Sequence, residues 1–260
     1  MKSKYSLEQD NAYTVDKWYM HVNNWYANDI NGNSYKPATN YILVEVTIED
    51  VKYFLNKQKF KKTIRDQINK LFENSNKYFF RVSQRSPKDA YKKKYQANNS
   101  DSYRKKLKLE NLRKSKLLVS ELDNVYDLIL RSERVMEDLE LLVKQNEVKS
   151  LHLVFQEWRP SNGIEFRLFI VDKKLVGICV YKPEFYSSKI TVPVGLILDW
   201  FNQFEKIYNT IPLYTVDIYI DKITEQVHFI EINPFNDQVD TFSFEYEDLI
   251  STKSLLVKIR

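Results

Sequence analysis

Apolar residues in the first third of the chain recur at the spacings of strands and helices. The runs 41–46 (YILVEV) and 77–82 (KYFFRV) predict two strands. Between them, Thr47 to Asp50 resembles a capping box that opens a helix carrying apolar residues at 51–55. Apolar positions at helical spacing within 64–72 predict a second helix. This part of the sequence therefore predicts a small α/β lobe.

The middle of the chain returns to helical spacing. The segments 117–130 and 135–142 each predict a helix, and Ser132 is the candidate N-cap of the second. Farther along, the aromatic stripe at 196–207 predicts a long amphipathic helix that packs on a sheet.

The remaining part of the second half predicts strands. The expected segments are 151–155, 165–171, 175–180, 216–220 and part of 228–235. The turn at 172–174 is short enough to join its neighbours as an antiparallel hairpin. We expect three parts in the chain: an N-terminal α/β lobe at 1–90, a basic insert at 91–118, and a C-terminal lobe at 119–260.

The last two strands carry three oxygen donors. Glu231 and Asn233 are two residues apart and therefore point to one face of a strand, and Asp217 reaches that face if the strands form a hairpin. Two carboxylates and a carboxamide, without His or Cys, suit a hard cation such as Mg²⁺ that also carries nucleotide phosphates. The alternative is an ordinary half-buried edge strand whose acid and amide face water. On the first interpretation the donors line a surface cleft, so replacing Asp217 or Asn233 by Ala is expected to abolish Mg-dependent nucleotide binding and leave the fold intact.

Two arginines could meet phosphate groups. Arg167 lies between Phe166 and Leu168 and so projects from the opposite face of its strand, and Arg81 is placed similarly after Phe80. A solvated or salt-bridged arginine is the alternative for each. The four glycines of the chain form neither a P-loop nor a dinucleotide-binding motif, which excludes P-loop, Rossmann and protein-kinase sites.

Composition narrows the class of protein. A length of 260 residues with 43% hydrophobic and 14% aromatic content predicts a folded chain and excludes wholesale disorder. No uninterrupted apolar stretch is long enough to span a membrane, and the first residues lack the apolar core of a signal peptide. The single Cys179 lies in an apolar run and predicts a buried, inert thiol. We therefore expect a cytoplasmic protein without a membrane partner.

The net charge of +5 is concentrated between Arg81 and Lys116. From Tyr91 to Lys116, lysines and arginines are interleaved with Tyr95 and Tyr103, a pattern that could engage RNA phosphates and bases. The alternative is a solvated loop without a specific partner.

Several segments together resemble the cell division cycle protein 123 family, which comprises atypical ATP-grasp proteins. The matching blocks are 80–90 (FRVSQRSPKDA), 153–158 (LVFQEW), 165–169 (EFRLF), the Asp217 strand through Phe235, and 242–250 (FSFEYEDLI). The order of an arginine-bearing hairpin, a helix, an Asp strand and a Glu-x-Asn strand also looks like the C-terminal half of the ATP-grasp fold. The resemblance implies two α/β lobes with antiparallel sheets and Mg·ATP in the cleft between them.

The resemblance also implies roles for individual residues. Asp217, Glu231 and Asn233 would hold the metal, and Arg81 and Arg167 would hold the phosphates. We count the following further residues of the matching blocks as nucleotide-binding: Lys88, Gln156, Glu157 and Trp158, the last three as the hinge beside adenine. The family usually has a basic residue at the position of Gln156 and Asp at the position of Glu231.

Members of this family act as assembly factors of eukaryotic translation initiation factor 2 and bind its gamma subunit. The resemblance thus implies an ATP-dependent assembly chaperone. Two alternatives share the same ATP site: an ATP-grasp ligase or a nucleotidyl or phosphoryl transferase that could act on RNA, and a silent mimic that interferes with the same partner. The sequence singles out no nucleophile or general base, so enzymatic activity stays undecided at this point.

Overall fold

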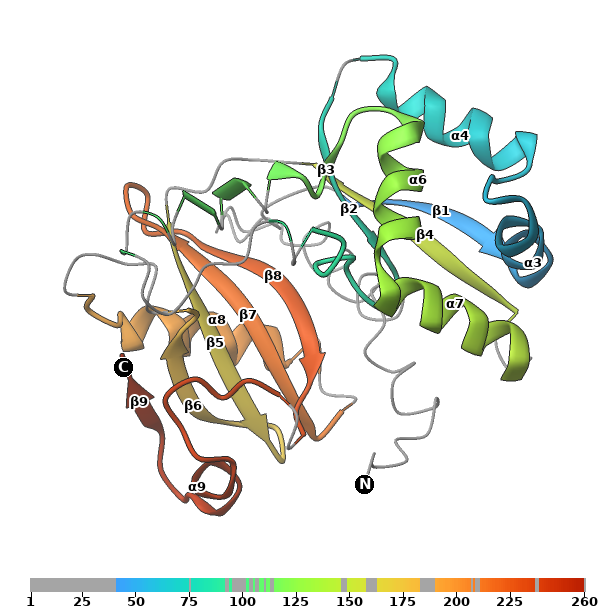
Figure 1. The fold of residues 1–260 in the computed structure, drawn as a ribbon. Helices are drawn as coiled ribbons and strands as arrows, with labels where there is room; N and C mark the ends of the chain where they lie inside the picture. The colour runs from blue at the N-terminus through green and yellow to red at the C-terminus, as the bar shows by residue number, and fades with distance from the viewer. Residues whose placement is uncertain are drawn as a thin grey trace. The chain divides into compact units, whose positions relative to one another are not determined.

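The structure is a computed structural model that describes most of the chain from residue 41 onward. The described residues are 41–74, 76–91, 94, 102, 105, 108–109, 111–112, 115–145, 149–157, 163–182, 190–206, 208, 211–236 and 239–259. They form two compact units, one within Thr39–Arg159 and the other within Pro160–Arg260. Each unit contains one sheet (Figure 1).

The first unit is built on a four-stranded antiparallel sheet. Its strands, in spatial order, are β1 (Tyr41–Thr47), β4 (Ser150–Glu157), β2 (Tyr78–Val82) and β3 (Leu118–Val119). β4 lies in the interior and pairs with both β1 and β2. A strand from the end of this unit therefore joins the two strands from its beginning.

Helices cover one face of this sheet. They are α3 (Ile48–Lys57), α4 (Lys62–Phe72), α6 (Leu122–Arg131) and α7 (Glu133–Gln145). Phe54 of α3, Ile129 of α6 and Leu139 of α7 surround a small apolar space together with Val82 and Leu153 of the sheet. Val82 and Leu153 are directly paired, so both side chains point to the helical face. The intervening strand residues point to the opposite face.

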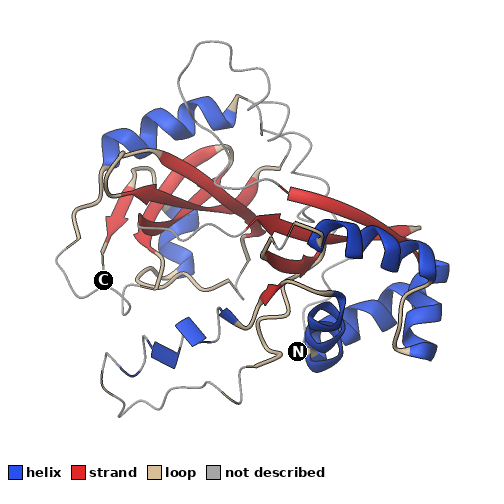
Figure 2. Ribbon diagram, turned by 90° about the horizontal axis from the view of Figure 1, so that it is seen from above, coloured by secondary structure: helices blue, strands red, loops and turns tan. Residues whose placement is uncertain are grey.

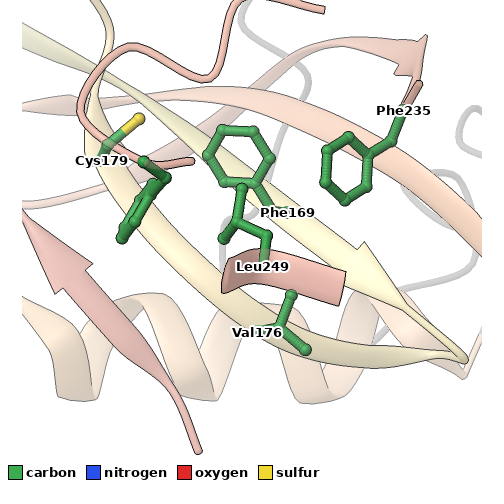
Figure 3. Packing of buried hydrophobic residues seen from close by; sticks show 6 residues of the cluster. Phe169, Val176, Cys179, Phe235 and Leu249 are labelled. Carbon is green, nitrogen blue, oxygen red and sulfur yellow. The ribbon is translucent and has the colours of Figure 1, made fainter. Parts of the chain in front are cut away.

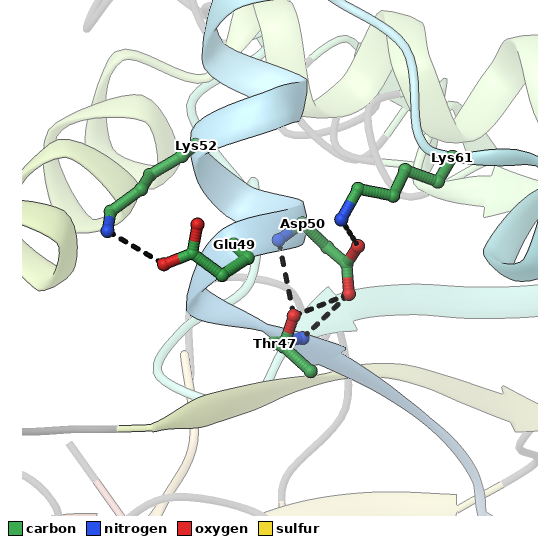
Figure 4. A network of polar contacts seen from close by, with 5 residues as sticks. All are labelled: Thr47, Glu49, Asp50, Lys52 and Lys61. Carbon is green, nitrogen blue, oxygen red and sulfur yellow. Dashed lines mark hydrogen bonds and ion pairs between the residues drawn. The ribbon is translucent and has the colours of Figure 1, made fainter.

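The predicted capping box at Thr47 is confirmed, and Figure 4 shows it in detail. The Asp50 amide donates to the Thr47 hydroxyl at 3.2 Å, and the Thr47 amide donates to the Asp50 carboxylate at 3.2 Å. Lys61 forms an ion pair with the other carboxylate oxygen at 2.7 Å. Burial works against the ionised form of Asp50, but the hydrogen bonds from Lys61 and Thr47 outweigh it and lower the pKa of this carboxyl. The turn from β1 into α3 is therefore fixed by side chains that the local sequence supplies.

The second unit is built on a five-stranded sheet. Its strands, in spatial order, are β8 (Val227–Pro234), β7 (Leu213–Asp221), β5 (Gly163–Val171), β6 (Lys174–Val180) and β9 (Leu256–Lys258). All neighbours pair antiparallel except β9, which runs parallel to β6. Helices α8 (Val194–Glu205) and α9 (Tyr246–Ser251) lie on opposite sides of this sheet (Figures 1 and 2).

The two faces of the second sheet have separate aromatic cores. On the α8 face, Trp200 and Phe204 stack at 4.9 Å between ring centroids, and Phe204 stacks on Phe229 of β8 at 5.8 Å. On the α9 face, Figure 3 shows a buried cluster formed by Phe169, Val176, Cys179, Phe235, Phe244 and Leu249. Each face of the sheet thus carries its own buried aromatic core, and Arg167, Thr215 and Asp217 are the polar residues of its described strands that are buried.

Most elements predicted from the hydrophobic pattern are confirmed, including the β5–β6 hairpin and the Ser132 cap of α7. The Val135 amide donates to the Ser132 hydroxyl at 3.2 Å. One helix start was wrong: Leu118 and Val119 form β3 instead, because Leu118 pairs with Phe79 of β2, and the helix begins at Leu122. β9 was not expected.

The division into units also differs from the expected boundary at residue 119. Helices α6 and α7 and strand β4 lie within Thr39–Arg159. The physical reason is that β4 is an interior strand of the first sheet, and α6 and α7 bury their apolar faces against that sheet. A short hydrophobic strand does not reveal which sheet it enters.

No helix in the described ranges combines the length and the apolar character needed to cross a bilayer.

Candidate functional site

A buried ion pair joins two of the predicted site residues. Arg167 of β5 and Asp217 of β7 are direct partners in the strand register. The guanidinium donates from Nε to Oδ1 at 2.7 Å and from Nη2 to Oδ2 at 2.8 Å, which is a bidentate contact. The remaining terminal nitrogen, Nη1, donates to the backbone carbonyl of Asp240 at 3.0 Å. Arg167 is therefore salt-bridged to Asp217, as the alternative interpretation of the sequence allowed.

This pair is shielded from solvent. Arg167 is 7% exposed and Asp217 is 3% exposed. Burial disfavours the charged guanidinium, but the charge and hydrogen bonds of Asp217 more than compensate, and the pKa of Arg167 is raised above its ordinary value. At 3% exposure Asp217 does not line a surface cleft as expected. We now expect its removal to destabilise the fold, since the loss would leave a buried arginine without its counter-charge.

Glu231 and Asn233 lie on the same sheet face as Asp217. Glu231 is the direct partner of Asp217 in the β7–β8 register, and Asn233 is the partner of Thr215. The Asn233 amide nitrogen donates to Oδ2 of Asp217 at 3.3 Å. A register shift follows Asp217: Ile218 pairs with Phe229, so β8 carries one extra residue, Ile230, at this point. Such bulges are frequent beside functional sites because they redirect neighbouring side chains.

The chemistry of this set fits a hard divalent cation. Two carboxylates and one carboxamide on adjacent strands provide oxygen ligands only. Asp217 Oδ1 accepts from Arg167, and Oδ2 accepts from both Arg167 and Asn233, so the carboxylate is held in one orientation beside Glu231. In the described part of the chain, His, Cys, Asp and Glu residues nowhere gather in threes at metal-binding distance. This absence does not bear on the predicted set, because that set contains only two acids and its third member, Asn233, is an amide. Metal binding by Asp217, Glu231 and Asn233 stays a prediction.

Aromatic side chains enclose the arginine. The guanidinium carbon lies 4.9 Å from the ring centroid of Tyr181 and 5.3 Å from that of Phe242, both distances typical of cation–π contacts. Burial raises the pKa of the Tyr181 hydroxyl, and the nearby Asp217 charge acts in the same direction. Burial also raises the pKa of the neighbouring Cys179 thiol to about 12. The interpretation of Cys179 as buried and inert from sequence therefore agrees with its surroundings.

The first unit holds the other predicted nucleotide-binding residues. Arg81 is 8% exposed and lies on the sheet face opposite the helices, because its neighbours Phe80 and Val82 occupy the helical face. Gln156 pairs with Phe79 in the same register and shares the face of Arg81. Lys88 is half-buried in the loop after β2. Glu157 ends β4, and Trp158 lies outside the described residues.

Two hydrogen bonds and one ion pair fix the loop that carries Lys88. The Asp89 carboxylate accepts from the Ser132 hydroxyl at 2.5 Å and from the Arg134 amide at 3.1 Å, so it caps the N-terminus of α7. Arg85 forms an ion pair with Asp138 on the same helix at 2.5 Å. The segment 80–90 is therefore held against α7 through Arg85 and Asp89. The sequence alone had not predicted these contacts.

The basic insert is described only in part. Tyr95 and Tyr103 lie outside the described residues. The Tyr91 hydroxyl donates to Asp127 of α6, and the Arg131 guanidinium lies 5.7 Å from the Tyr91 ring centroid. Tyr91 thus packs on α6, and RNA binding by the insert stays a prediction.

Sequence reasoning missed several residues around Arg167. Tyr181, Phe242 and the Asp240 carbonyl all contact it, and Thr215 lies on the same face as Asp217. The segment 242–250 belongs to the blocks that resemble the family, but the sequence assigned no function to it. Alternation along β7 could have singled out Thr215, because it is two residues from Asp217.

Comparison with known proteins identifies related chains. The sequence model of a family described as D123 matches residues 111–258. A protein of Vanderwaltozyma polyspora named translation initiation factor eIF2 assembly protein is 28% identical over 144 residues, which cover 51% of this chain and 39% of that protein. Cell division cycle protein 123 of Candida glabrata is 25% identical over 143 residues, covering 51% and 40%. The match thus spans about two fifths of the length of these relatives.

A solved structure shares the fold. The structure of Cdc123 from Schizosaccharomyces pombe superposes with a TM-score of 0.64 at 18% identity and covers 98% of both chains. This likeness confirms the α/β fold with antiparallel sheets that the family resemblance implied. The motif resemblance is likewise confirmed for residues 111–258, whereas the block 80–90 precedes the matched segment.

Proposed function

Because the chain belongs to the D123 family, we propose that it binds Mg·ATP and assists the assembly of translation initiation factor 2 by binding the gamma subunit of that factor. In this proposal Asp217, Glu231 and Asn233 hold the cation. The cation would bridge and neutralise phosphate oxygens. The cytoplasmic location expected from the sequence belongs to the same proposal.

One observation carries the nucleotide part of the proposal: Arg167, Asp217, Glu231 and Asn233 occupy one face of three neighbouring strands. The bidentate contact fixes the orientation of the Asp217 carboxylate, and the hydrogen bond from Asn233 brings the third donor beside it. Both terminal nitrogens of Arg167 keep a second N–H that can donate to a phosphate oxygen. On the family resemblance, we also assign Arg81, Lys88, Gln156, Glu157 and Trp158 to nucleotide binding.

Calorimetric titration with ATP, with and without Mg²⁺, tests this site. We expect Mg-dependent binding in the unaltered chain and a loss of roughly tenfold or more in affinity for Glu231→Gln and Asn233→Ala, because each removes a ligand oxygen or its charge. Glu225→Gln is the matched control, since this exposed residue lies in the turn between the same two strands. Equal affinities in all four proteins would refute the site.

The partner part of the proposal rests on relatives that are named as eIF2 assembly proteins and that are longer than the matched segment. A pull-down with purified gamma subunit, in the presence of Mg·ATP and in its absence, tests it. Retention of the gamma subunit supports the proposal, and failure to retain it under both conditions counts against it.

The same preparation separates a chaperone from a ligase. Incubation with radiolabelled ATP, Mg²⁺ and candidate acceptors should give no steady product if the protein only binds nucleotide. Sustained product formation would favour the ligase or transferase interpretation instead.

A further inference from the structure

Thr215 is a buried hydroxyl without a hydrogen-bond partner in the described structure. The residue is 0% exposed, and its Oγ1 has no donor or acceptor among the described residues. Buried hydroxyl groups normally find a partner, and leaving one unpaired costs stability. A valine at this position would have nearly the same shape without that cost. The hydroxyl therefore requires an explanation other than packing.

The register places Thr215 beside the proposed metal ligands. It lies two residues before Asp217 on β7, so both side chains point to the same face. It is the direct cross-strand partner of Asn233 on β8 and of Phe169 on β5. Phe169 packs edge-on against Phe235 at 5.4 Å between ring centroids, and both belong to the buried cluster on this face. Within this apolar cover, Asn233 is a polar side chain directly opposite the threonine.

The carboxamide of Asn233 could form a different hydrogen bond if it turned its oxygen toward a cation. Its amide nitrogen now donates to Asp217 Oδ2 at 3.3 Å, which is at the long end for such a bond. A carboxamide can bind a cation only through its oxygen, because the amide nitrogen has no available lone pair. As a metal ligand beside Asp217, Asn233 must turn its oxygen to the cation, and its nitrogen then needs another acceptor. The Thr215 hydroxyl lies directly across the strand pair and can accept that hydrogen.

We propose that Thr215 is a positioning residue for Asn233: its hydroxyl accepts a hydrogen bond from the Asn233 amide when the carboxamide oxygen faces the divalent cation. This role rests on the proposed Mg·ATP site. It explains why a hydroxyl stands in a buried position where the described residues offer it no partner. Groups that orient a metal ligand in this way commonly change metal affinity when they are removed.

Two substitutions separate the hydroxyl from the methyl group of Thr215. Thr215→Val keeps the shape and removes the hydroxyl, whereas Thr215→Ser keeps the hydroxyl and removes the methyl. We expect Thr215→Val to weaken Mg-dependent ATP binding by roughly 10- to 100-fold, with ATP binding in the absence of Mg²⁺ unchanged. Thr215→Ser should bind Mg·ATP nearly as the unaltered chain does.

The stability of the nucleotide-free protein provides the second readout. Thr215→Val should melt at the same or a higher temperature than the unaltered chain, because an unpaired buried hydroxyl is removed. Thr215→Ser should melt lower, because a buried methyl is lost. The order of stabilities is thus the reverse of the order of affinities, which a purely structural role cannot produce.

Three results would overturn the role of Thr215. They are unaltered Mg·ATP affinity in Thr215→Val, an equal loss of affinity in Thr215→Ser, and a lower melting temperature in Thr215→Val. The unaltered chain is titrated first: if it binds no Mg·ATP, the proposed function itself fails and this role falls with it. If it binds and Thr215→Val binds equally, only the role of Thr215 fails.

Discussion

At the scale of single residues, the second unit is organised around one buried charge pair. Arg167 and Asp217 satisfy each other bidentately, and the Asp240 carbonyl and two aromatic rings complete the surroundings of the guanidinium. Alternation along each strand was sufficient to predict which face these side chains use. It could not predict their contact, because that depends on β5 lying beside β7 although β6 follows β5 in the sequence.

Replacing Asp217 by Asn should destabilise the fold strongly. The change leaves Arg167 charged and buried without its counter-charge, and we expect a loss of about 3–5 kcal/mol in the free energy of unfolding. Urea denaturation followed by circular dichroism measures it. Asp66→Asn is the control, because its ion pair with Lys62 is exposed on α4 and should contribute about 0.5 kcal/mol or less. Similar small losses in both variants would contradict the importance assigned to the buried pair.

Cys179 should be unreactive in the native protein. Its side chain is fully buried, and its pKa is raised to about 12, so little thiolate exists at neutral pH. We expect alkylation by iodoacetamide at pH 8 to proceed only as fast as the protein opens, and to become rapid in denaturant. Because the chain has a single cysteine, mass spectrometry reports this site directly. Fast labelling without denaturant would show that this face of the sheet opens easily.

At the scale of elements, helix caps connect segments distant in sequence. Asp89 caps α7 from the loop after β2, whereas Thr47 and Asp50 cap α3 within the local sequence. The local cap was predicted from its residue pattern, but the distant one could not be, because no local pattern links Asp89 to Ser132. The same distinction applies to strands: β1, β2 and β4 were recognised individually, but their spatial order depends on non-local pairing.

Replacing Asp89 by Ala should weaken the attachment of its loop to α7. The change removes acceptors for the Ser132 hydroxyl and the Arg134 amide, and we expect a loss of about 1–2 kcal/mol in the free energy of unfolding. Hydrogen exchange should show faster exchange at the Arg134 amide, whereas α3 should be unaffected. Thr47→Ala is the reciprocal control, because it weakens only the start of α3. Unchanged exchange at Arg134 in the Asp89 variant would contradict the cap.

At the scale of the whole molecule, buried weak acids predict sensitivity to alkaline pH. Burial raises the pKa values of Cys179, Tyr181 and Tyr214 above their ordinary values of 9.0 for the thiol and 10.0 for the phenols. In the folded protein these groups stay protonated at a pH at which the unfolded chain ionises. Their contribution to stability is therefore complete below about pH 9 and is lost as the pH rises toward the folded values.

Denaturation midpoints measured between pH 7 and 11 test this expectation. The midpoint should hold up to about pH 9 and fall above it. Absorbance near 295 nm should show that some tyrosines ionise only together with unfolding. Tyr181→Phe provides the control, since it removes one of these groups and should reduce the fall. A midpoint that is constant through pH 11 would contradict the prediction.

The strand order of the first sheet has a consequence for synthesis on the ribosome. β1 and β2 do not pair with each other: β2 has an earlier neighbour only in the short β3, and β1 pairs with β4, which the chain supplies only at Ser150–Glu157. Until that segment emerges from the exit tunnel, β1 has no neighbour and one edge of β2 is unpaired, so both remain available to other nascent chains, whereas α3 and α4 can already form. We therefore expect the N-terminal half to stay open through much of its translation and to close in one step when β4 arrives.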